Sequence, residues 1–92
     1  MKMTVKFFAR AREIVGVREE AVDVKDASTV LEVLKLLAMK HGANFNEYLF
    51  EPNSNNPHKY LRFLLNGRSA STSDQVPARD SVLAIVPPTA GG

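Results

Sequence analysis

The clearest helix signal in this chain is Thr29-Val-Leu-Glu-Val-Leu-Lys-Leu-Leu-Ala-Met-Lys-His-Gly42. Its apolar residues recur at helical spacing and form one stripe, which predicts a helix buried against a sheet. Thr29 and Glu32 fit a capping box at the start, and Gly42 stands where a C-terminal cap belongs. The stripe consists of Val30, Val33, Leu34, Leu37 and Ala38, widened by Leu31 and Leu36.

Segments with the alternation of strands stand on both sides of this helix. In the first of them, Met3, Val5 and Phe7 would face the core. Asn66-Gly67 is the dipeptide most typical of a tight hairpin turn. The sequence predicts strands over 2–8, 19–24, 60–65, 68–71 and 82–86, a turn of helix over 9–15, and a loop over 51–57.

This order of elements predicts an α+β domain. If the first and last strands lie side by side in the middle of the sheet, they run parallel through a crossover. We therefore expect a β-grasp fold, with a mixed sheet of about five strands and one main helix packed on one face. The domain would span residues 1–86, and residues 87–92 would form a flexible tail.

The composition narrows the function classes. The net charge is +2, from 12 basic and 10 acidic residues, and the basic residues are scattered, which gives nucleic-acid binding little support. We expect a cytoplasmic protein without membrane contact, because no segment resembles a membrane span or a signal peptide. The absence of cysteine excludes disulfides, thiolate zinc sites and cysteine nucleophiles. His41 and His58 lack carboxylates at ligand spacing, so we expect surface or loop histidines and no metal.

The chain closes with Pro87-Pro88-Thr89-Ala90-Gly91-Gly92. Neither glycine has a Cβ, so the backbone there fits channels too narrow for other residues, and the prolines stiffen the approach. Extended at roughly 3.3–3.6 Å per residue, the six residues would carry the terminal carboxylate about 20 Å from the domain. These features predict a tail that enters another protein's active site, although many chains end in small, frayed residues.

The sheet face opposite the helix is the expected docking surface. Four large apolar side chains would point there, and an exposed apolar patch usually marks an interaction site. Alternatively, residues 43–59 fold over this face and make it a second core, and a one-residue error in strand phase would exchange the two faces. The predicted partner-binding residues are Phe8, Leu64, Leu83 and Ile85, together with Pro87, Pro88, Thr89 and Ala90.

Three motifs follow one another along nearly the whole chain, with residues 43–59 outside them. Phe8 to Gly16 resembles the F-A-x-x-R-E-x-x-G opening of the ubiquitin-like sulfur carriers, and is closest to the small subunit of molybdopterin synthase (the MoaD type). Leu65 to Arg68 matches that family's L-N-G-x turn, and residues 80–92 resemble its ending, a D-x-V strand leading to P-P-x-x-G-G. Arg79-Asp80 departs from the usual Gly-Asp, and residues 43–59 are similar to those of longer archaeal members that include small protein modifiers.

The resemblance implies that Gly92 is the reacting residue, with Gly91 beside it. An activating enzyme that uses ATP and Mg²⁺ would convert the carboxylate to an acyl-adenylate, and a sulfur donor protein would replace AMP to leave a thiocarboxylate. In the molybdopterin branch, the tail would enter the large subunit of molybdopterin synthase and donate sulfur to a cyclic pterin monophosphate. The chain itself would be the non-catalytic, sulfur-donating subunit and would bind no cofactor.

Three alternatives share parts of this pattern. A ubiquitin-like modifier, joined through Gly92 to lysines of target proteins, would pass through the same adenylate. A thiamine-pathway carrier is disfavoured, because such carriers are usually shorter and lack the F-A-x-x-R-E opening. A plain binding module with an inert tail is the third alternative.

Overall fold

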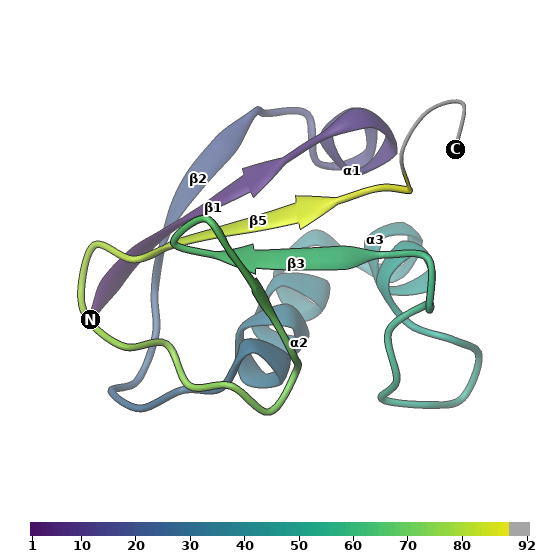
Figure 1. The fold of residues 1–92 in the computed structure, drawn as a ribbon. Coiled ribbons are helices and arrows are strands. Elements are labelled where there is room, and N and C mark those ends of the chain that lie inside the picture. The colour runs from purple at the N-terminus through teal and green to yellow at the C-terminus, as the bar shows by residue number, and fades with distance from the viewer. Residues whose placement is uncertain (89–92) are drawn as a thin grey trace.

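One mixed sheet of five strands carries helices on one side in the computed structural model, which describes residues 1–88 (Figure 1). In chain order the elements are β1 (Lys2–Phe7), α1 (Ala9–Val15), β2 (Glu19–Asp23), α2 (Val30–His41), α3 (Ala43–Leu49), β3 (Arg62–Leu65), β4 (Arg68–Ala70) and β5 (Val82–Val86). The strand order is β2-β1-β5-β3-β4, and β1 and β5 are parallel neighbours at the centre. The predicted β-grasp fold is confirmed.

The hairpin of β1 and β2 follows the predicted alternation. Met3, Val5 and Phe7 are all buried in the core, at 1%, 0% and 2% exposure. The short helix α1 ends at Gly16, whose φ of 90° places it in the left-handed region that favours glycine. The two antiparallel strands are therefore joined through a helix of seven residues, about two turns, which ends at Val15 as the sequence predicted.

Helix α2 confirms the stripe and the capping box. The Oγ1 atom of Thr29 accepts from the backbone N–H of Glu32 at 3.2 Å, and the Oε1 atom of Glu32 accepts from the N–H of Thr29 at 2.9 Å. All five residues of the stripe are buried. Leu36 was expected on the buried face but is 39% exposed, because it lies roughly 100° around the helix from Leu37.

Helix α3 lies on the same side of the sheet as α2 (Figure 1). Phe45 of α3 is fully buried, and its ring meets Phe7 of β1 edge-to-face with the centroids 5.8 Å apart. Because Phe7 faces the core, α3 extends that core. Helix α3 thus joins the predicted main helix on the same face, and the alternative that this segment covers the opposite face is wrong.

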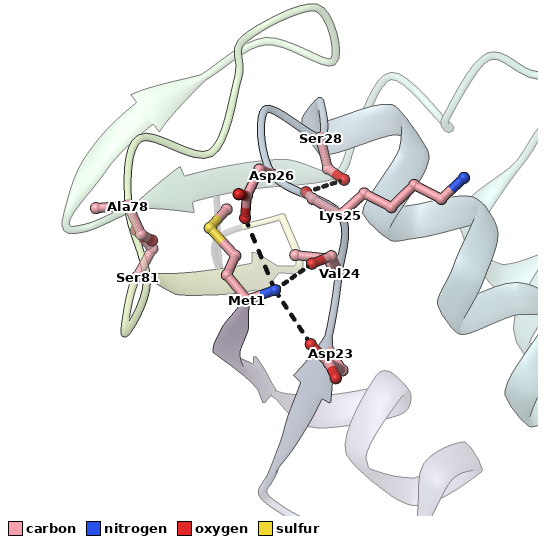
Figure 2. Close-up of polar contacts among 8 residues, drawn as sticks. All are labelled: Met1, Asp23, Val24, Lys25, Asp26, Ser28, Ala78 and Ser81. Carbon is pink, nitrogen blue, oxygen red and sulfur yellow. Dashed lines mark hydrogen bonds and ion pairs between the residues drawn. The ribbon is translucent and has the colours of Figure 1, made fainter.

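Polar contacts fasten the end of the sheet where β1 and β5 begin (Figure 2). The amino nitrogen of Met1 donates to the carbonyl oxygen of Val24 at 2.5 Å and lies 3.1 Å from the carboxylate of Asp23. Beside it, the hydroxyl of Ser81 is buried and donates to the carbonyl oxygen of Ala78 at 2.6 Å. Strand β5 is thus anchored at its start, and its other end leads to the tail.

Candidate functional site

The base of the tail leaves the sheet at its centre. Strand β5 pairs with β1 in parallel and with β3 in antiparallel orientation, so both of its backbone edges are hydrogen-bonded. Pro87 is half-buried and Pro88 is exposed directly after it. The predicted reacting residues Gly91 and Gly92, with Thr89 and Ala90 of the predicted contact set, lie outside the described residues.

Asn66 of the L-N-G turn holds the start of β5. Its backbone N–H donates to the carbonyl oxygen of Val82 at 2.8 Å, and its Oδ1 atom accepts from the N–H of Val82 at 2.8 Å. Its amide also donates to the hydroxyl of Ser81 at 3.3 Å. The φ of 52° at Asn66 is one that asparagine tolerates better than most residues. The same residue therefore forms the hairpin turn and fixes the position of the strand that leads to the tail.

Two of the predicted docking residues do not lie on the face assigned to them. Leu83 and Ile85 are 0% exposed and belong to the core. In the parallel ladder Leu83 is opposite Val5 and Ile85 is opposite Phe7, and residues directly opposite share a face. The predicted orientation of Leu83 and Ile85 was therefore wrong. The alternation of side chains along β5 is shifted by one residue from the prediction, and such a shift exchanges the two faces of a strand.

The side of the sheet away from α2 and α3, which we call the open face, has a different apolar centre. Leu64 lies on this face opposite Ala84, and both side chains are half-buried. Phe8 is 44% exposed, and its extended backbone turns its side chain away from that of Phe7. The open face comprises Thr4, Lys6, Arg62, Leu64, Val82, Ala84 and Val86.

The sequence reasoning missed Val82, Ala84 and Val86 as open-face residues. All five residues of β5 are apolar, so no polar position marks the exposed side. The usable signal was side-chain size, because the large Leu83 and Ile85 alternate with smaller residues. The large side chains fill the core, and the smaller ones lie half-buried on the open face.

Two ion-pair contacts join strand β2 to the end of helix α2. At one edge of the sheet, Glu20 of β2 accepts from Nζ of Lys40 at 2.8 Å and meets Nε2 of His41 at 2.5 Å. Partial burial alone would raise the pKa of Glu20, but the hydrogen bonds from Lys40 and His41 outweigh it and lower that pKa. These groups join β2 to the end of α2 and have a structural role.

The two histidines are held by neighbours within the fold. The half-buried ring of His41 meets Phe7 and Phe45 edge-to-face, at centroid distances of 6.0 and 5.6 Å. His58 stacks on Tyr60 with the centroids 5.0 Å apart.

Within residues 1–88 no group of three or more His, Cys, Asp or Glu side chains is placed to hold a metal ion. Over the same residues no helix has the length and apolar character that crossing a membrane requires.

Comparisons with known proteins agree with this geometry. SAMP1 from Haloferax volcanii is 30% identical, with a TM-score of 0.85 and 100% coverage of each chain. The putative molybdopterin converting factor, subunit 1, from Pyrococcus furiosus is 26% identical, with a TM-score of 0.78 and coverage of 97% of this chain and 99% of that one. A chain of the Amycolatopsis orientalis BexX/CysO complex, 23% identical at a TM-score of 0.72 over 98% and 99% of the two chains, shows the fold alone.

No curated protein matched the sequence. The solved structures establish that the fold is that of ubiquitin-like carriers and modifiers. The model of the ThiS family matches residues 5–92, which is nearly the whole chain and includes all three motifs. This chain belongs to the ThiS family.

Proposed function

We propose that this chain is a sulfur carrier that donates sulfur from a thiocarboxylate on Gly92, as the small subunit of molybdopterin synthase. The observation that carries the proposal is the position of β5, whose end at Val86 passes from the centre of a ThiS-family sheet directly into Pro87 and Pro88. The similarity to the putative molybdopterin converting factor subunit supports the pterin branch.

The proposed chemistry begins with activation, because a carboxylate is a poor electrophile. A partner enzyme with ATP and Mg²⁺ joins the Gly92 carboxylate to AMP and releases pyrophosphate. The terminal sulfur of a donor protein's persulfide then attacks the carbonyl carbon, and AMP leaves. A second thiol of the partner reduces the resulting S–S bond to release the thiocarboxylate. Both thiols come from partners, because this chain has no cysteine.

The open face and the base of the tail would together bind both partners, the activating enzyme and the large subunit. Phe8, Leu64, Pro87 and Pro88 remain in the predicted contact set, and the half-buried residues of β5 on the open face join them. The large subunit would supply the pocket, the acid–base groups and the phosphate contacts for the pterin. The anchored sheet would hold the body while the tail reaches the sulfur acceptor.

Deletion of Gly92 tests the proposal. Intact mass of the chain from native cells should show one oxygen-to-sulfur exchange at its C-terminus, and the deletion should abolish that exchange and the supply of sulfur to the cofactor. The fold should be unaffected, because the buried core of the domain runs from Met3 to Ile85. The control is the Ala43→Ser variant, which is changed at an exposed position of α3 and should acquire sulfur on Gly92 as the wild type does. Continued cofactor synthesis by the deleted chain would refute the proposal.

A second function is favoured by the similarity to SAMP1, which extends over the full length of both chains. In this function Gly92 would form an isopeptide bond with lysines of other proteins. Trypsin would leave residues 80–92 on such a lysine, because Arg79 is the last basic residue. An Ala90→Arg chain would shorten this remnant to Gly-Gly, which is simpler to detect by mass spectrometry. Absence of both remnants in cells rich in the protein would exclude modification.

A further inference from the structure

A positively charged hollow lies beside the base of the tail. It has a volume of about 510 Å³. Its walls come from residues 59–63 at the start of β3, from the short strand β4 and from Pro88. We call it the basic hollow. It is lined by Lys59, Tyr60, Leu61, Arg62, Phe63, Ser69, Ala70 and Pro88.

The charge of the basic hollow is not neutralised by its surroundings. Lys59 and Arg62 are exposed, and neither takes part in an ion pair or a side-chain hydrogen bond within residues 1–88. The lining contains no carboxylate over the same range. The acidic residues of the sheet lie on β2, which is separated from β3 by β1 and β5. Two like charges thus share one concave surface, where they favour an anionic ligand.

One wall of the basic hollow is held in place before any ligand binds. Tyr60 is half exposed, and its ring stacks on His58 with an interplanar angle of 10°. Nε2 of His58 donates to the carbonyl oxygen of Glu47 in α3 at 2.9 Å. The aromatic wall is therefore fixed to the helical layer, which lowers the entropic cost of binding against it.

We propose that the basic hollow binds an acidic segment of the activating enzyme, which must take in the tail to load Gly92 with sulfur. The inference rests on the proposed function, because a partner that takes in residues 89–92 must come close to Pro88. Arg62 is suited to a carboxylate through two parallel hydrogen bonds, and Lys59 adds a second positive charge. Such contacts select partners and speed encounter more than they add affinity. The hollow would distinguish the correct partner from other proteins with a tail-binding channel.

Charge reversal is the first test. The double variant Lys59→Glu/Arg62→Glu is compared with Lys25→Glu/Arg79→Glu, which makes the same charge change at exposed residues outside the hollow. We expect the first pair to lower the rate of thiocarboxylate formation in native cells at least tenfold, measured by intact mass, and the control pair to leave it within about twofold of wild type. Equal rates in the two variants, whether both normal or both reduced, would overturn the inference.

A second test does not depend on sulfur transfer. Hexaglutamate peptide is titrated into the full chain, and amide NMR shifts are followed. We expect shifts concentrated at Tyr60, Ser69 and Ala70 that vanish at high salt and in the Lys59→Glu/Arg62→Glu variant, with none from hexalysine. If shifts are absent, or are spread over all basic residues, acidic peptide does not bind specifically in the basic hollow and the inference is refuted. If wild-type chain carries no thiocarboxylate in cells, the proposed function fails, and this titration still decides whether the hollow binds acidic peptide.

Discussion

At the residue scale, Leu83 and its neighbour Val82 point to opposite sides of the sheet from one apolar strand. Leu83 is fully buried opposite Val5, whereas Val82 is half-buried on the open face opposite Thr4. The difference comes from the parallel ladder, which sets Leu83 beside residues that already face α2. A fully buried leucine contacts core side chains on all sides, so its removal leaves a cavity.

Leu83→Ala should lower the free energy of unfolding by about 2–5 kcal/mol, because the site can collapse only partly. Denaturant unfolding followed by circular dichroism measures this change. Leu64→Ala, at the half-buried position on the open face, should cost about 1 kcal/mol or less. The reverse ranking of the two variants would contradict the assignment of the faces.

At the element scale, the contact of β2 with the end of α2 depends on one carboxylate. Glu20 is opposite Val5 in the hairpin and so points to the helical side, where Lys40 and His41 bind it. Its lowered pKa means that the folded chain favours the charged carboxylate. That preference stabilises the fold above the ordinary pKa of 4.5 and is lost as the pH falls through the lowered pKa.

Glu20→Gln should reduce the free energy of unfolding by ~0.5–1 kcal/mol at neutral pH, a modest value because solvent screens the pair. The deficit relative to wild type should shrink as the pH drops below 4.5, since wild type then loses its carboxylate contacts. Denaturant titrations across this range give the comparison, with Glu19→Gln as the matched exposed control. A deficit that does not change with pH would rule out the charged contact as its source.

At the scale of the whole molecule, the sheet has one side covered by helices and one open face. The side that carries α2 and α3 holds one continuous core, and the open face leaves Leu64 and its apolar neighbours half-buried beside the base of the tail. Under the proposed function, stability and partner binding therefore depend on opposite sides of the same strands. This separation allows changes on the open face that leave the fold intact.

The double variant Phe8→Ala/Leu64→Ala should therefore fold with a melting temperature within about 10 °C of wild type and lower sulfur loading about tenfold. Loading is read from the intact mass of chain recovered from native cells. Leu36→Ala/Met39→Ala removes exposed apolar side chains from the helical side and should load normally. Normal loading in both variants would remove the open face from the docking surface.

The features that the sequence determined by itself are local ones. The α2 stripe, its capping box, the Gly16 stop and the Asn66-Gly67 turn each depend on groups a few residues apart, so periodicity and residue type predicted them. The succession of elements led to the expectation of the first and last strands side by side at the centre, and Gly91 and Gly92 are known from the sequence alone.

Only the tertiary structure decided the rest. Which side of β5 faces the core depends on its pairing with β1, because an all-apolar strand has no polar residue to mark its phase. Two other features join segments that are far apart in the chain. They are the hydrogen bonds between Asn66 and Val82, and the basic hollow, which is lined by residues 59–63, 69–70 and 88. Such contacts exist only after the strands have paired, and no pattern within a single segment encodes them.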